Sequence, residues 1–255
     1  MKNRIYLVFV TITMCSFIGN AQVYTVTYKR YVNTSHNNSE EPIKELDEGF
    51  FLKNSIASFL TLSYNNGTSL FRASTEAEVV IDEVNSNEYK MSTNRIAESN
   101  YYKNQKKQEL IVYHPNMFPS FYGKDVIVHS SLPKNDWKLS DQSQKIAGYS
   151  CKLATKIKDN GQKIVAWYAD QIPINDGPAE YWGLPGLILQ LQISDRVLHV
   201  VTSIKKESKA IDILKPTGGE VMTNEQFKKF KQEMLKPRTI TTSDGRVITI
   251  SGSNN

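Results

Sequence analysis

The sequence predicts a mainly β protein: one curved antiparallel sheet or half-barrel of hairpins, with a C-terminal amphipathic helix packed on it. Three observations lead to this fold class. Runs of alternating apolar and polar residues recur along the chain, as in half-buried strands. Asn-Gly and Asp-Gly pairs stand between several of these runs, which is typical of tight hairpin turns. One segment near the C-terminus carries helix signals. With 40% hydrophobic and 22% charged residues, the 255-residue chain has an ordinary globular composition.

The first predicted strand is Gln22–Val32, which places Tyr24, Val26, Tyr28 and Val32 on one face. The polar run 36–41 ends at Pro42 and predicts a loop. Further strands are expected at 110–114 and 124–130.

Three hairpins are predicted with turns at Asn66-Gly67, Asn160-Gly161 and Asp244-Gly245, because these pairs readily adopt positive φ. The strands expected to flank these turns are 56–64 with 69–73, 152–158 with 163–169, and 239–242 with 247–250.

The most regular alternation lies in 187–193, and it predicts one face made of Leu187, Leu189, Leu191 and Ile193. Residues 188, 190 and 192 would then point to the other face. A turn at 194–196 leads into 197–204, so these two strands are expected to form a fourth hairpin. The stretch 216–220 is interpreted as a linker to the helix.

A helix is predicted after Thr223, which forms a capping box with Gln226. Met222 is placed to contact Phe227 across the helix start, and Pro237 marks the helix end. The apolar face consists of Phe227, Phe230 and Met234, and the basic face of Lys228, Lys229, Lys231 and Lys236. A membrane-surface helix is the alternative, but we expect this short helix to dock on the sheet with its basic face in solvent.

The N-terminal segment 1–21 has the features of a secretory signal peptide. Lys2 and Arg4 precede an apolar run, and Gly19-Asn20-Ala21 supplies small residues at the cleavage site. The mature protein is expected to begin at Gln22, to form a single domain over 22–255 and to have no transmembrane span. A retained membrane anchor and a lipid-modified Cys15 are the alternatives; Cys15 lacks a small residue before it.

The chain carries 31 basic and 26 acidic residues, a mixed surface that does not indicate a nucleic-acid partner. The four histidines are far apart in sequence, and no zinc or phosphate-loop motif is present. We therefore predict no catalytic residue, no metal site and no cofactor. Cys151 is the single cysteine of the predicted mature chain, so it forms no intramolecular disulfide. It is either a catalytic nucleophile or, as we expect, a buried small hydrophobe.

The most distinctive passage runs from Asp176-Gly177-Pro178 through an aromatic pair into the strand from Leu187. Its glycines permit positive φ or close backbone approach. The passage is therefore interpreted as a rigid structural loop, with a binding rim as the functional alternative. The candidate binding residues are Tyr181, Trp182, Gly183, Leu184, Pro185, Gly186 and Trp167.

The hexapeptide Gly183-Leu184-Pro185-Gly186-Leu187-Ile188 resembles the signature of the GLPGLI family, which comprises secreted proteins of Bacteroidota. The resemblance spans about 136–206, including 145–154 and 165–173. It implies an exported protein, periplasmic or attached to the cell envelope. The function of that family is not established, so the resemblance implies no catalytic residues.

Three hypotheses on function remain. The first is a non-enzymatic envelope protein that binds an apolar ligand or lipid, as in the lipoprotein-carrier class, which such a curved sheet with a helix would resemble. The second is an interaction partner of an outer-membrane receptor complex, bound through the aromatic loop or a sheet edge. The third is an enzyme that uses Cys151 or dispersed carboxylates.

Overall fold

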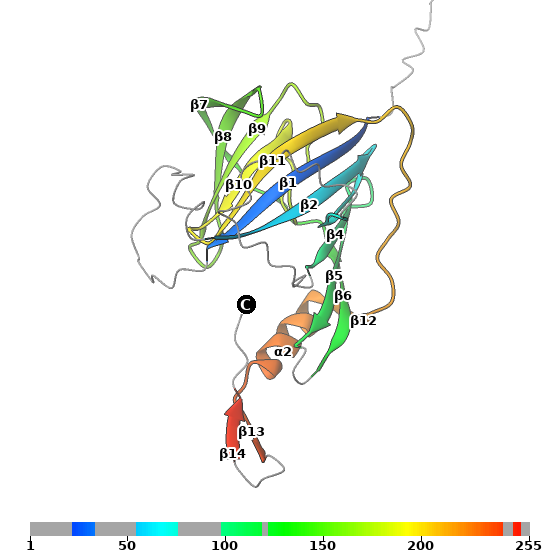
Figure 1. Ribbon diagram of the computed structural model, residues 1–255, viewed down its shortest axis with the longest axis vertical. Coiled ribbons are helices and arrows are strands. Elements are labelled where there is room, and N and C mark those ends of the chain that lie inside the picture. The colour runs from blue at the N-terminus through cyan, green and yellow to red at the C-terminus, as the bar shows by residue number, and fades with distance from the viewer. Residues whose placement is uncertain (1–21, 34–54, 76–97, 119–121, 242–246, 251–255) are drawn as a thin grey trace, which may run out of the picture.

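The computed structural model describes residues 22–33, 55–75, 98–118, 122–241 and 247–250. Twelve strands form one open sheet, and a helix, α2 (Asn224–Met234), follows its last strand (Figure 1). A separate two-stranded sheet consists of β13 (Arg238–Thr241) and β14 (Val247–Ile250). The prediction of a mainly β protein with a C-terminal helix is therefore confirmed.

The large sheet is built from two antiparallel meanders. The first meander contains β1 (Val23–Asn33), β2 (Ser55–Asn65), β3 (Thr68–Ala73), β4 (Asn100–Asn104), β5 (Glu109–Met117) and β6 (Lys124–Ser131). The second contains β7 (Lys138–Ile146), β8 (Tyr149–Ile157), β9 (Lys163–Ala169), β10 (Leu187–Ile193) and β11 (Val197–Lys206). Antiparallel pairing of β1 with β11 joins them. With β12 (Glu220–Thr223) at one edge, the full order is β12-β6-β5-β4-β3-β2-β1-β11-β10-β9-β8-β7.

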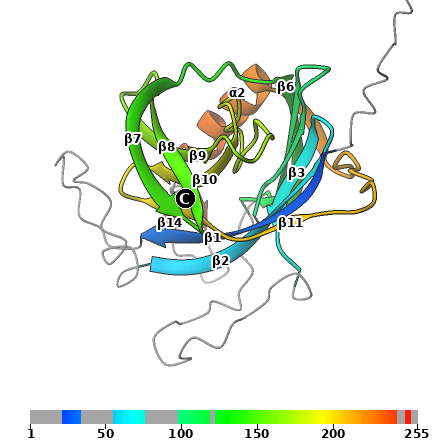
Figure 2. The same ribbon diagram turned by 90° about the horizontal axis from the view of Figure 1, so that it is seen from above.

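The sheet curves into an open half-barrel, with β6 and β7 on opposite sides of the opening (Figure 2). The loop between β9 and β10 and helix α2 both lie inside the curve. Strand register defines the residues that share this concave face. One row across the strands consists of Val26, Leu62, Phe71, Tyr101, Val112 and Val128. The concave face is therefore the apolar face of the sheet.

The segment 207–219 crosses the convex face on its way from β11 to β12 (Glu220–Thr223). Ile213 packs there against a small cluster that contains Tyr102, Ile111 and Ile127. The Asn65 side chain donates a hydrogen bond of 2.8 Å to the carbonyl of Ile211. This segment therefore ties the two meanders together on the side opposite the loop and the helix.

The predicted hairpins agree with the structure where it describes them. Asn66 and Gly67 both have positive φ, 48° and 87°, between β2 and β3. Between β8 and β9 only Gly161 of the predicted pair has positive φ, 81°, and Asn160 does not, so this turn differs from the one expected. β10 pairs antiparallel with β11 as expected. β13 pairs with β14 as expected, but the predicted turn Asp244-Gly245 lies outside the described residues, as do the loop 36–41 and the segment 1–21.

The predicted single face of β10 is wrong. A β-bulge between Ile188 and Gln190 shifts the alternation by one residue. Leu187 and Leu189 therefore pack in one core cluster, whereas Ile188 and Leu191 pack in a second cluster. Gln190 is 2% exposed, so β10 is buried on both of its faces.

Three strands were not expected from the sequence. β7 is an edge strand whose side chains are mostly exposed, so it shows no apolar alternation. β4 has only five residues. β12 includes the end of the predicted linker and pairs parallel with β6, which lies about 90 residues earlier in the chain. The expectation of a purely antiparallel sheet is therefore corrected at this edge.

The helix begins as the sequence predicts. The Thr223 hydroxyl accepts a hydrogen bond from the backbone N–H of Gln226, and the Gln226 side chain accepts one from the N–H of Thr223. Met222 and Phe227 pack in one cluster with Val126 and Val128 of β6. The helix therefore docks its apolar face on the concave side of the first meander.

Candidate functional site

The loop between β9 and β10 occupies the concave face of the second meander (Figure 2). Ile172 and Ile174 of this loop pack in the core cluster that contains Tyr28 and Leu60. The following loop residues Ala179, Tyr181 and Leu184 pack in the cluster formed by β8, β9 and β10. The chain thus fills the inside of its own half-barrel with a loop.

A buried lysine from the first meander organises this loop. Lys103 lies on β4, and both its side chain and that of Asp176 are 0% exposed. Lys103 Nζ contacts Asp176 Oδ1 and donates hydrogen bonds of 2.7 Å and 2.8 Å to the carbonyls of Gly177 and Ala179. All three ammonium protons therefore have an oxygen acceptor on the loop, which is the condition for keeping a charge in a dry interior.

The carboxylate of Asp176 acts on its own chain as well. Asp176 Oδ1 accepts a hydrogen bond of 2.7 Å from the Gly177 N–H. The backbone carbonyl of Asp176 accepts one of 3.0 Å from the Ile188 N–H. Burial, and secondly the negative charge of Asp176, raise the pKa of Tyr28 and that of Tyr64. The Tyr28 hydroxyl stays protonated and donates a bond of 2.7 Å to the Ile188 carbonyl.

Two tryptophans fasten the loop to the connection 132–137, which leads from β6 to β7. Trp182 Nε1 donates a hydrogen bond of 2.8 Å to the carbonyl of Pro133. Trp137 Nε1 donates one of 2.9 Å to the carbonyl of Trp182. Both indole N–H groups are therefore used within the chain.

The candidate binding residues divide by exposure. Tyr181 and Leu184 are each 1% exposed, and Gly186 is buried. Trp182 is half-buried, and Gly183 and Pro185 are exposed. Trp167 is half-buried on β9 and packs against the other core cluster, not against Tyr181. The structure thus groups residues 181–186 in one loop with Trp167 apart from them.

The glycines of this loop have the conformation that the structural interpretation requires. Gly183 has φ 89° and Gly186 has φ 154°. A Cβ atom on Gly186 would overlap the carbonyl of Ala169 on β9, whereas one on Gly183 would meet open space. Gly186 therefore permits a close backbone approach, and Gly183 permits a turn.

Sequence reasoning missed Lys103, although this residue does most to hold the loop. A lysine in a strand is usually exposed, and Asn100–Asn104 shows no alternation that would place it inside. The partner Asp176 is 73 residues away, so no local spacing links the two side chains.

Cys151 is buried, as predicted, with 0% exposure. Its Sγ donates a weak hydrogen bond of 3.6 Å to the carbonyl of Tyr149. Burial raises the pKa of the Cys151 thiol to about 11, so almost none is thiolate at neutral pH.

We expect a polar maleimide to leave the native mature protein unlabelled at neutral pH, because Cys151 is inaccessible and protonated. The same reagent should label it fully in urea, which mass spectrometry can follow. Replacement of Cys151 by Ala should cost about 1 kcal/mol of unfolding free energy through a small cavity. Rapid labelling of the folded protein would contradict this expectation.

No group of three or more His, Cys, Asp or Glu side chains among the described residues is placed to hold a metal ion. No helix in the same residues is long and apolar enough to cross a bilayer.

A shallow depression of about 420 Å³ lies at the β4–β5 turn and the end of β6, and its lining is polar: Lys107, Gln108, Glu109, His129, Ser130 and Ser131.

The C-terminal part of the described chain forms an arm. Helix α2 packs on β6 and β12, and Phe227 stacks on the His114 ring with centroids 4.6 Å apart. The β13–β14 hairpin follows α2 and projects from the body of the protein (Figure 1). Among the described residues, the hairpin pairs with no strand of the large sheet.

We expect acid to weaken the docking of α2. Burial, and secondly the charge of Lys231, lower the pKa of His114 to about 4. In the unfolded chain the histidine pKa is near 6.5, so the unfolded chain binds a proton at His114 more readily than the folded protein does. The free energy of unfolding therefore falls as pH drops from about 6.5 towards 4. In urea titrations over this range, His114→Phe should reduce the slope of unfolding free energy against pH. An unchanged slope would contradict this role of His114.

Comparison with known proteins gives a partial assignment. Residues 157–190 match the Porph_ging family model, which is described as a protein of unknown function. This segment covers β9, the loop and the first half of β10. No curated protein matches the chain.

Among solved structures, PNGF-II in the P21 space group matches with a TM-score of 0.54 and 16% identity. The match covers 86% of this chain and 35% of PNGF-II. PNGF-II in the C2 space group gives 0.52, 15% identity and the same coverage. At this identity the likeness concerns the fold alone, and this chain corresponds to 35% of the length of PNGF-II.

Proposed function

We propose that this chain is an exported GLPGLI-type protein of the cell envelope that binds another protein and performs no catalysis. The observation that carries the proposal is the projecting β13–β14 hairpin, which has no partner strand in the large sheet. Export is supported by the basic start, apolar run and small residues of 1–21. The family assignment is supported by the hexapeptide 183–188, which lies inside the matched segment.

The concave face favours a protein partner over an apolar ligand or lipid. A carrier needs an apolar cavity that its cargo can enter. Here the loop side chains of Ile174, Tyr181 and Leu184 pack on the concave face of the sheet. Phe227 of α2 covers part of the same face at β6. Cargo would have to displace a loop that Lys103 and Asp176 hold in place.

The sheet edges are poorly suited to strand addition. β7 has a register irregularity between Leu139 and Ser143, and Lys138 and Lys145 lie along it. Bulges and lysines are the features by which edge strands avoid pairing with other chains. The other edge, β12, has only four residues. The hairpin is therefore the better contact element.

A free two-stranded hairpin is at best marginally stable in water. In this hairpin the Val247 side chain is 68% exposed. Contact with a partner would bury this apolar surface and stabilise the hairpin.

Truncation tests the proposal. A chain that ends at Lys236 lacks the hairpin but keeps α2 and the large sheet. Its unfolding free energy should stay within about 0.5 kcal/mol of the full chain, because no core residue is removed. Crosslinking in the native envelope, followed by mass spectrometry, should capture one protein with the full chain and lose it on truncation.

Leu139→Ser on β7 is the matched control, because Leu139 is 57% exposed on the sheet edge and far from the hairpin. This variant should keep the crosslinked partner. Capture of the same protein by the truncated chain would refute the hairpin as the contact. Recovery of a lipid and no protein with the full chain would favour the ligand hypothesis instead.

A further inference from the structure

A row of aromatic rings lies where α2 meets the turn between β5 and β6, at the end of the arm (Figure 1). The ring centroid of Phe230 on α2 is 4.8 Å from that of Tyr122 and 5.8 Å from that of Phe118. Phe230 also stacks on Phe227, with centroids 6.3 Å apart. Phe118, Tyr122 and Phe230 are each partly exposed, so solvent reaches three of the four rings.

A lysine ammonium lies against each end of this row. Lys124 Nζ is 5.6 Å from the centroid of the Tyr122 ring, and Lys231 Nζ is 4.8 Å from that of Phe227. Both lysines are exposed. A lysine can lay its stem along an apolar ring and keep its ammonium group in water. The end of the arm therefore presents apolar rings and positive charges side by side.

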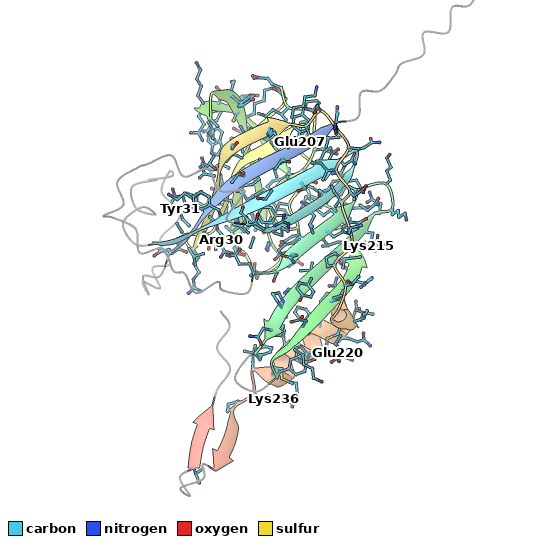
Figure 3. The ribbon with its side chains drawn as sticks, turned by 45° about the vertical axis from the view of Figure 1, so that its right-hand side comes forward. Arg30, Tyr31, Glu207, Lys215, Glu220 and Lys236 are labelled. Carbon is cyan, nitrogen blue, oxygen red and sulfur yellow. The ribbon has the colours of Figure 1, made fainter. Side chains whose placement is uncertain are left out.

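The side of the arm that carries α2 has an excess of positive charge. Lys124 is two residues before Val126, which packs under the helix, so both residues point to this side. The described residues 122–128 and 220–236 place five basic side chains here: Lys124, Lys228, Lys229, Lys231 and Lys236. The acidic ones are Glu220, Glu225 and Glu233. Lys236 and Glu220 mark this end of the molecule in Figure 3.

The acidic groups are engaged within the chain or face elsewhere. Glu220 accepts a hydrogen bond of 2.6 Å from the Tyr122 hydroxyl, and Glu233 pairs with Lys236. Asp125 lies on the convex face, where its carboxylate accepts a hydrogen bond from Tyr113. The lysines are therefore the charges that this side offers to an approaching surface.

The pairing of rings with lysines favours a lipid surface over a protein. Protein interfaces are rich in aromatic residues but poor in lysine. At a membrane surface both kinds of residue are frequent, because rings enter the boundary between headgroups and acyl chains, and lysines contact anionic headgroups. Short amphipathic helices with a lysine-rich polar face are typical of such surfaces.

We propose that Phe118, Tyr122 and Phe230, with the lysines around them, bind the surface of an anionic phospholipid bilayer. The rings enter the headgroup boundary, and the lysines neutralise lipid phosphates. No lipid enters the half-barrel, whose concave face is filled by the loop between β9 and β10. The contact uses α2 and the β5–β6 turn, so it is separate from the protein contact proposed for the β13–β14 hairpin.

Vesicle flotation with the chain that begins at Gln22 tests the proposal. This chain lacks the apolar segment 1–21, which would bind lipid by itself. We expect it to float with vesicles of phosphatidylcholine and phosphatidylglycerol, and to stay unbound with phosphatidylcholine alone. Added salt should weaken the binding, because exposed charges are screened. Equal binding to both kinds of vesicle, or binding to neither, would overturn the proposal.

Charge reversal locates the contact. Lys228→Glu combined with Lys229→Glu should weaken binding by about tenfold or more, because two exposed positive charges become negative. The matched control is Lys138→Glu combined with Lys163→Glu, the same charge change at exposed positions on β7 and β9 of the second meander. This control should bind as the wild type does. Equal weakening by both double variants would reflect net charge alone and would overturn the site.

Phe118→Trp reports whether the rings meet the bilayer. The native tryptophans, Trp137, Trp167 and Trp182, lie on the second meander, its loop and the connection leading to it. Brominated phosphatidylglycerol vesicles should therefore quench the added indole and leave the wild-type emission unchanged. Quenching of the wild type would place the contact on another face. An unquenched variant that polyglutamate displaces from vesicles would favour an acidic protein surface. Either result would overturn the proposal.

Discussion

Replacing Lys103 by Met should be the most destabilising single change among the polar residues that hold the β9–β10 loop. The substitution leaves the carboxylate of Asp176 fully buried without its countercharge, and it removes the donor from the carbonyls of Gly177 and Ala179. Loss of one partner of a buried ion pair typically costs about 3–5 kcal/mol. Urea unfolding of the variant should show a loss of this size.

Two further variants separate the buried pair from a general effect of lysine removal. Lys152 pairs with Asp170 on the surface, where the two side chains are 54% and 41% exposed, so Lys152→Met should leave the urea midpoint unchanged. Lys103→Met combined with Asp176→Leu should recover much of the loss, because no unpaired charge remains. A Lys103→Met protein as stable as the wild type would refute the assigned role of this lysine.

The second large effect is expected at Gly186. Alanine there would bring a Cβ into the Ala169 carbonyl of the neighbouring strand, at a φ of 154° that L-residues rarely adopt. Overpacking and backbone strain each cost about 1–3 kcal/mol. We therefore expect Gly186→Ala to lower the unfolding free energy by roughly 2–6 kcal/mol, measured by urea or thermal unfolding.

Gly183→Ala is the matched comparison within the same loop. Its φ of 89° is also unfavourable for alanine, but a Cβ there meets nothing within 4 Å. Only the strain contribution of about 1–3 kcal/mol should appear. Equal losses at the two glycines would show that the close approach to Ala169 does not matter.

The hairpins and the helix could be predicted because their signals are local. Asn66-Gly67 adopts positive φ at both residues, and Thr223 caps α2 through its own hydroxyl. These features depend on side chains within about four residues of each other, so neighbouring sequence contains the needed information. The burial of Cys151 also followed from its apolar neighbours on β8.

The candidate site could be predicted only in part. The turn conformations of Gly183 and Gly186 were expected from the sequence of the loop. The position of the loop inside the half-barrel was not, because it depends on Lys103, on Pro133 and on the curvature of the whole sheet.

By itself, the sequence determined the mainly β class, the turns at Asn66-Gly67 and Asn160-Gly161 and the start of α2. Only the tertiary structure decided the pairing of β1 with β11, the parallel addition of β12 to β6 and the bulge in β10. Backbone hydrogen bonds between strands are the same for every side chain, so strand order depends on which surfaces bury each other in the complete fold. The buried charge of Lys103 follows the same rule, since its cost is offset only by oxygen acceptors that the folded loop provides.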